Sequence, residues 1–155
     1  SGRHYGATGR LEEGWSPATV TAFRARCEKL IASYDREEPL PGLRVNGRLT
    51  LSENIADLGG VELALDAFQR TEAYRSGRKI DGQTPLQRFF LAYAFSFAGQ
   101  VRPETLAKRL RSNTHLPAAQ RINVVLRHID RFHEAFGTKP GDPMWLDPAE
   151  RVRIW

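Results

Sequence analysis

The sequence predicts a mainly α-helical fold. Apolar residues recur at intervals of three and four in several segments, which is the spacing of one buried helix face. Ser16-Pro17 and Thr84-Pro85 each pair a capping side chain with proline at the first helical position, a typical helix start. Stretches rich in glycine and proline separate these segments. With 155 residues and 41% apolar content, we expect residues 1–155 to form a single domain, or one lobe of a larger domain.

The first predicted helix runs from Ser16 to Tyr34. Its apolar residues at helical spacing are Val20, Phe23, Cys27, Leu30, Ile31 and Tyr34. Cys27 is the single cysteine, and we expect a small buried thiol here rather than half of a disulfide. The stretch 37–42 holds two prolines and a glycine, so the helix must end, and residues 43–49 are expected to be extended or in turns.

The second predicted helix runs from Thr50 to about Tyr74. Thr50 and Glu53 have the spacing of a capping box, and Ile55, Leu58, Val61, Leu65 and Phe68 continue at helical spacing. Gly59-Gly60 lies inside this segment, where each glycine costs about 1 kcal/mol relative to alanine. We therefore expect another backbone to pack closely against this pair.

The remaining helices are predicted after Thr84. Thr84 and Gln87 repeat the start signal of the most apolar helix, which ends near Gly99 and is the best candidate for the core. Pro103 opens a shorter basic helix to about Arg111, and residues 112–117 are predicted to be a loop. A last short helix through Ile129, Phe132 and Phe136 stops at Gly137.

Composition excludes few partners, but it disfavours two classes. No apolar run is long enough to span a bilayer. The net charge of +5 permits acidic partners, yet aromatic residues do not alternate with basic ones and no standard nucleic-acid motif occurs. We therefore expect neither a membrane span nor a nucleic-acid partner. Neither the composition nor the motifs indicate a cellular compartment.

Glu53 and Asp57 are the clearest candidates for chemistry, because residues four apart share one face of a helix. Glu53 is suited to be an oxygen ligand of a metal, with Asp57 accepting the free ring N–H of a ligating histidine. A second interpretation stays open from the spacing alone. Both carboxylates lie in the first turns of the helix, where they also interact favourably with the helix dipole without any metal.

The segment around these acids resembles the hallmark of the neprilysin family of zinc metallopeptidases. The similar stretches are Val45-Asn46-Gly47, residues 49–60, Gly14-Trp15-Ser16-Pro17, residues 87–94, Arg102-Pro103-Glu104, His115-Leu116-Pro117, Arg121-Ile122-Asn123, residues 132–137, Met144 and Trp155. The resemblance thus covers almost the whole chain. It implies the helical lobe of a thermolysin-like, or gluzincin, zinc peptidase catalytic domain, and specifically its carboxyl-terminal segment.

The resemblance also implies roles for individual residues. Glu53 matches the glutamate zinc ligand, and Asp57 matches the aspartate behind it. His115 matches a catalytic histidine that stabilises the oxyanion of the tetrahedral intermediate. Arg121 matches the arginine that holds a substrate carbonyl.

A further pair, Ser96 and Phe97, falls where the family lines the pocket for the residue after the scissile bond, which would be partly polar here. Without the resemblance these assignments would be weaker. His115 would be a loop residue, Arg121 one surface arginine among many, and Phe97 a core residue at helical spacing from Tyr93.

One part of the family's site has no match in these residues. The mechanism needs a His-Glu-x-x-His helix, whose histidines bind zinc and whose glutamate activates the metal-bound water. That pattern is absent, and His128 and His133 are five apart and are expected to be surface or packing residues. Residues 4–9 resemble the segment that follows that helix in the family, so the chain is expected to begin just downstream of it. We therefore expect weak zinc binding and no peptidase activity from this chain alone.

Two functions follow from the sequence. The first is a zinc-dependent metalloendopeptidase of the neprilysin type acting on short peptides, with zinc as cofactor in a complete site. The second is a non-catalytic peptide- or protein-binding module descended from such a peptidase. In either case the face of the Glu53 helix that would meet the histidine helix needs a cover, from the preceding part of the same enzyme or from a second copy of the chain.

Overall fold

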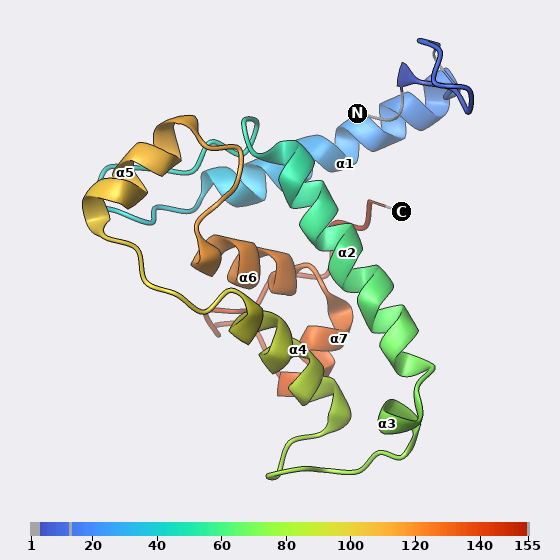
Figure 1. Ribbon diagram of the computed structural model, residues 1–155, viewed down its shortest axis with the longest axis vertical. Helices are drawn as coiled ribbons and strands as arrows, with labels where there is room; N and C mark the ends of the chain where they lie inside the picture. Colours follow the sequence, from blue (N-terminus) through green and yellow to red (C-terminus); the bar gives the residue numbers. More distant parts are fainter. Residues whose placement is uncertain (1–3, 13, 155) are drawn as a thin grey trace.

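The computed structural model describes residues 4–12 and 14–154, and this part of the chain contains helices but no strand (Figure 1). The mainly α-helical prediction is confirmed. The helices are α1 (Pro17–Asp35), α2 (Leu51–Gln69), α3 (Glu72–Arg75), α4 (Pro85–Ser96), α5 (Pro103–Ser112), α6 (Ala118–Arg127) and α7 (Asp130–Phe136). Trp155, which belongs to the family resemblance, lies outside the described residues. None of the described helices is both long and apolar enough to cross a membrane.

Helix α1 begins where the sequence predicts. The Ser16 hydroxyl accepts the N–H of Thr19 at 3.1 Å, and Pro17 occupies the first helical position. The buried face consists of Cys27, Leu30, Ile31 and Tyr34, as the spacing predicts. This face packs against α2 and α6.

The connector between α1 and α2 turns sharply at Gly47. The Gly47 N–H donates to Asp35 Oδ1 at 2.7 Å, and a Cβ at this position would lie 2.6 Å from the backbone oxygen of Ile31. Asn46 Oδ1 accepts the N–H of Leu49 at 2.9 Å and closes the turn. These contacts fix the point at which α2 starts relative to α1.

The predicted capping box of α2 does not form. The Thr50 hydroxyl donates to the backbone oxygen of Asn46 at 3.2 Å and accepts from Asn54 Nδ2 at 2.9 Å, so it does not cap the helix. Thr50 and Asn54 are both buried, and satisfying the buried Asn54 amide takes priority over the cap. The prediction was wrong here because a capping box is a local pattern, and a buried neighbour competes for the same hydroxyl.

Helix α2 also ends earlier than predicted. It stops at Gln69 instead of continuing to Tyr74, and the separate α3 follows. The Thr71 hydroxyl donates to the Phe68 oxygen at 2.7 Å and accepts the N–H of Tyr74 at 3.3 Å. Thr71 therefore ends one helix and caps the next.

Helix α4 has the predicted capping box, but it is not the centre of the core that the sequence predicts, because only Pro85 and Phe90 of this helix are buried. The Gln87 N–H donates to Thr84 Oγ1 at 3.2 Å, and the Thr84 N–H donates to Gln87 Oε1 at 2.9 Å. Phe90 is buried, and its ring meets that of Phe132 edge to face at 5.6 Å. The helix ends at Ser96, three residues before the predicted Gly99.

The last predicted helix, through Ile129, Phe132 and Phe136, is α7, and the helix α6 that precedes it was not predicted. Helices α6 and α7 are separated at His128 and Ile129, where Ile129 is extended at φ −96° and ψ 110°. His128 and His133, predicted to be surface or packing residues, are both buried and therefore pack inside the protein. Helix α7 stops as predicted at Gly137, which is left-handed at φ 61°.

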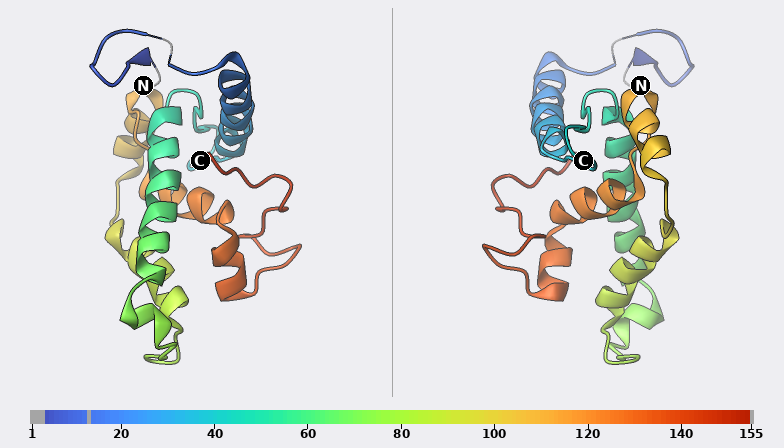
Figure 2. Two further views of the ribbon diagram at one scale, coloured as in Figure 1. Left: turned by 90° about the vertical axis from the view of Figure 1, so that its right-hand side faces the viewer. Right: turned by 90° about the vertical axis from the view of Figure 1, so that its left-hand side faces the viewer.

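The helices are arranged so that the carboxyl-terminal segment, residues 138–154, returns toward α1 (Figure 2). Val152 and Ile154 of this segment are buried in the same core as Leu30, Leu58 and Val124. Helices α4 and α7 pack together, and α6 contacts both α2 and α7. The carboxyl-terminal end of the described chain is thereby tied to the same core as α1.

Candidate functional site

The face of α2 predicted to carry chemistry presents Glu53 to a residue far along the chain. Glu53 Oε2 lies 3.1 Å from Nε2 of His115. The two side chains keep exposed fractions of 36% and 52%, respectively. Glu53 is therefore a carboxylate with a single polar partner among the described residues and with access to solvent.

Asp57, one helical turn along, holds Arg121 in a two-pronged ion pair. Arg121 Nε donates to Oδ2 at 2.8 Å, and Nη2 donates to Oδ1 at 2.6 Å. Only 13% of the Asp57 side chain and 24% of the Arg121 side chain are exposed. The hydrogen bonds to Asp57 raise the pKa of Arg121 further above its ordinary value, against the opposing effect of burial.

The loop before α6 and the first turn of that helix place His115 opposite Glu53 and Arg121 opposite Asp57. Asn113 Oδ1 accepts the backbone N–H of His115 at 2.9 Å, and the next residue, Leu116, is buried. Pro117 then caps α6, which carries Arg121. His115 and Arg121 thus approach one face of α2 together, each opposite one of the two acids.

Tyr93 of helix α4 and Phe97 at its end both contact Arg121. The guanidinium carbon of Arg121 lies 4.5 Å from the centre of the Phe97 ring, a cation–π contact. The Tyr93 hydroxyl donates to the backbone oxygen of Arg121 at 3.0 Å, and the Tyr93 and Phe97 rings meet edge to face at 5.3 Å. Burial, and then the Asp57 carboxylate, raise the pKa of the Tyr93 hydroxyl above its ordinary value, so this group stays a donor.

Two outcomes on α4 concern the sequence predictions. Phe97 lies against Arg121, whereas Ser96 is exposed and its hydroxyl donates to the Tyr93 backbone oxygen at 2.7 Å. That these two residues line a substrate pocket stays a prediction. Tyr93 is a site residue that sequence reasoning missed. Its spacing from Phe90 and Phe97 assigned it to the core, and only its hydroxyl group indicated a need for a polar partner.

An apolar groove of about 320 Å³ continues from Asp57 along α2 and α4. Its lining residues are Ala56, Asp57, Gly60, Val61 and Ala64 of α2 with Phe89, Ala92 and Tyr93 of α4. The close packing predicted at Gly59-Gly60 is absent at Gly60, where an added Cβ would meet nothing within 4 Å. Gly60 is exposed and faces the groove, so its small size leaves space there instead of admitting a backbone of this chain.

The described residues fit one edge of a zinc site rather than a whole one. A catalytic zinc takes three protein ligands and a water. Across residues 4–12 and 14–154, no group of three or more His, Cys, Asp and Glu side chains could hold a metal ion. Glu53 offers a carboxylate oxygen, and both oxygens of Asp57 already accept from Arg121.

Comparison with known proteins relates the whole chain to one family. The model described as "Peptidase family M13" matches residues 1–152. Neprilysin-1 of Caenorhabditis elegans is 34% identical over 162 residues, which cover 100% of this chain and 21% of that protein. Human endothelin-converting enzyme 1 is 32% identical over 157 residues, which cover 99% of this chain and 20% of that protein. The chain therefore spans about a fifth of the length of the curated relatives it matches.

The fold is also that of a solved peptidase. The crystal structure of the Mycobacterium tuberculosis zinc metalloprotease Zmp1 in complex with an inhibitor matches with a TM-score of 0.91 and 36% sequence identity. The match covers 99% of this chain and 24% of that one. The helical arrangement described above is thus the predicted helical lobe of a zinc peptidase catalytic domain.

Proposed function

Because this chain belongs to peptidase family M13, the neprilysin family, we propose that it forms the Glu53-bearing part of a zinc-dependent metalloendopeptidase that hydrolyses short peptides. Residues 1–155 would be one domain-like unit, corresponding to the carboxyl-terminal segment of the catalytic domain. The observation that carries this proposal is the pairing of Glu53 with His115 and of Asp57 with Arg121 on one helical face. Four residues from three parts of the sequence thus meet on this face, which supports the proposal.

Glu53 would supply one oxygen ligand to the zinc ion of the complete enzyme. Within the described part of the chain, its partner His115 contacts Glu53 through the ring and Asn113 through the backbone N–H. When bound, the metal polarises the scissile carbonyl and lowers the pKa of its water. His115, beside this ligand, would donate a hydrogen bond to the oxyanion that forms on that carbonyl.

Asp57 and Arg121 would act together on the substrate side. Two of the five guanidinium N–H groups of Arg121 are used by Asp57, which leaves three for a peptide carbonyl. Asp57 holds the guanidinium in one orientation, and Phe97 stacks against it. Asp57 would in addition accept the ring N–H of a zinc-bound histidine, as carboxylates commonly do. Ser96 and Phe97 would border the pocket for the residue after the scissile bond.

The remaining zinc ligands would come from a His-Glu-x-x-His helix, which these 155 residues do not contain. The groove beside Asp57 supports this, because the small side chains of Ala56, Gly60 and Ala64 leave a face of α2 on which another helix can lie. The partner would be the preceding part of the same enzyme, and a self-dimer is the competing arrangement.

The test measures zinc content and peptide cleavage with and without the missing helix. The 155-residue chain alone should retain much less than one zinc per chain and cleave no peptide. Joined to a family M13 portion that carries the His-Glu-x-x-His helix, it should hold one zinc per chain and cleave short peptides.

Two substitutions sharpen this test. Glu53→Gln in the joined protein should abolish zinc retention, whereas Asp66→Asn is a matched control on α2, because Asp66 pairs only with Arg70 among the described residues. Equal zinc content in the Glu53 variant would count against its role as a ligand. Peptide binding without cleavage, in a joined protein that holds zinc, would favour the non-catalytic binding module.

A further inference from the structure

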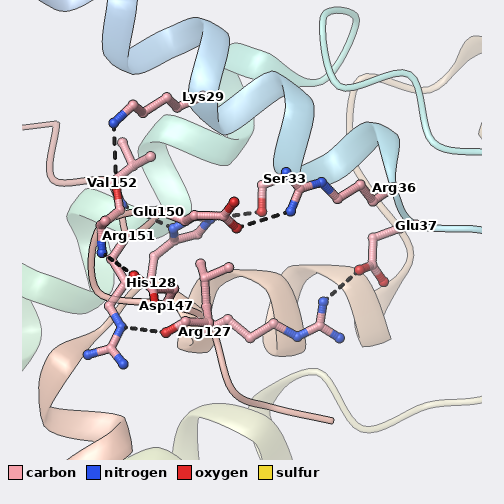
Figure 3. Close-up of polar contacts among 12 residues, drawn as sticks. Lys29, Ser33, Arg36, Glu37, Arg127, His128, Asp147, Glu150, Arg151 and Val152 are labelled. Carbon is pink, nitrogen blue, oxygen red and sulfur yellow. Dashed lines mark hydrogen bonds and ion pairs between the residues drawn. The ribbon is translucent and has the colours of Figure 1, made fainter. Parts of the chain in front are cut away.

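His128 lies at the end of α6, between α1 and the carboxyl-terminal segment, and its hydrogen bonds define its tautomer. The backbone N–H of Val152 donates to His128 Nδ1 at 3.1 Å (Figure 3). A backbone N–H can only donate, so Nδ1 must carry a lone pair and Nε2 must carry the proton. Nε2 therefore donates to the hydroxyl oxygen of Ser33 at 3.1 Å.

This direction of donation decides what Ser33 can do. A histidine that activates a serine nucleophile must accept the serine proton, and here Nε2 already carries a proton. Ser33 is thus not an activated nucleophile. Its own hydroxyl proton is free to donate, and the described residues offer it no acceptor within hydrogen-bonding distance.

Ser33 lines a pocket of about 160 Å³ between α1 and the carboxyl-terminal segment, with Lys29, Ala32, Arg36, Leu146, Ala149 and Glu150. Lys29 Nζ lies 3.5 Å from the backbone oxygen of Ala149, the limit of a hydrogen bond. Arg36 forms an ion pair with Glu150 (Figure 3). The paired atoms are 3.2 Å apart, but the two side chains are 63% and 51% exposed. Such an exposed ion pair is weak and easily exchanged.

We propose that this pocket binds a small oxyanion between Lys29, Ser33 and Arg36, either a carboxylate or a tetrahedral anion such as phosphate or sulfate. Lys29 and Arg36 are cationic and line the pocket together with Ser33, whose hydroxyl proton has no acceptor among the described residues, against one carboxylate, that of Glu150. The buried His128 imidazole orients the Ser33 hydroxyl group by donating a hydrogen bond to its oxygen. The site is independent of the proposed peptidase function, because none of its residues belongs to the Glu53 and Asp57 face.

The test is a titration of the protein with sodium sulfate and with sodium acetate at neutral pH, against sodium chloride at matched ionic strength. Proton–nitrogen NMR spectra should show saturable shifts of the backbone amides of residues 29–36 and of the His128 ring. Saturation by sulfate alone assigns a tetrahedral anion, and saturation by acetate alone assigns a carboxylate. If neither anion differs from chloride, the proposal is wrong.

Substitutions assign the binding to these side chains. Lys29→Met, Arg36→Gln and Ser33→Ala should each weaken binding, by about tenfold for a lost charge-assisted hydrogen bond. Glu150→Gln removes the competing carboxylate and should tighten binding. Arg44→Gln is the matched control, because Arg44 is also an exposed arginine in a single ion pair, with Glu38 at 3.4 Å. Unchanged binding in the Lys29 and Arg36 variants would show that the anion lies elsewhere.

Discussion

Acidification should destabilise this protein through His128. The side chain is 2% exposed, and its Nδ1 accepts a hydrogen bond from the Val152 N–H. Protonation would place an N–H against that donor and a charge in the core. Burial, reinforced by the charges of Arg127 and Arg151, lowers the pKa of His128 from 6.5 to about 4.

The sign and size of the effect follow from proton linkage. Between these two pKa values the unfolded chain binds a proton that the folded protein does not, so the free energy of unfolding falls as the pH falls. The pKa of about 4 in the folded protein lies about 2.5 below the value of 6.5 in the unfolded chain. At a pH below both values, the free energy of unfolding is therefore about 3 kcal/mol lower than at a pH above both. From about pH 7 to about pH 5 the expected loss is about 2 kcal/mol.

Urea unfolding of the protein and of a His128→Asn variant measures this directly. The asparagine oxygen can still accept the Val152 N–H, but the side chain does not titrate. The variant should lose about 2 kcal/mol less than the parent over the same pH interval. His133, whose pKa burial also lowers, is present in both proteins, so its contribution cancels. Equal losses in the two proteins, or a His128 ring titrating above about pH 6 in NMR spectra, would refute this reasoning.

Four other substitutions test the packing around the site and in the core. Arg121→Met should lower the free energy of unfolding by about 2 kcal/mol, because it leaves the largely buried Asp57 charge without a partner. Adding Asp57→Asn should restore most of the lost free energy of unfolding, as measured by urea titration. Phe90→Ala should cost about 3–5 kcal/mol and give a lower thermal midpoint, since this ring is buried in the core; a loss under about 1 kcal/mol would mean that the core is loosely packed. Gly47→Ala should destabilise by at least about 1 kcal/mol, because its Cβ would lie 2.6 Å from a backbone oxygen of α1. Gly60→Ala should be neutral or stabilising by up to about 1 kcal/mol, since open space surrounds that position; equal thermal midpoints for the two glycine variants would contradict this.

Much of the helical framework could be predicted from local sequence. Ser16-Pro17 and the pair Thr84 and Gln87 start helices as predicted, because the groups that satisfy the first N–H donors lie within three residues. The stop at Gly137 is equally local, since it depends on a left-handed backbone that glycine adopts easily. In the site, the spacing of Glu53 and Asp57 predicted that both acids share one face of a helix. The order and spacing of the family motifs predicted His115 and Arg121 as further site residues.

Which acid meets which partner was decided only by tertiary structure. Glu53 meets His115 and Asp57 meets Arg121 because α2 packs on α6, a contact between segments about 60 residues apart that no local pattern encodes. The same holds for Thr50, whose hydroxyl serves the buried Asn54 instead of a cap. Local sequence determines hydrogen bonds whose two ends lie within one turn. Where a polar group is buried, its partner depends on which distant segment the core brings to it.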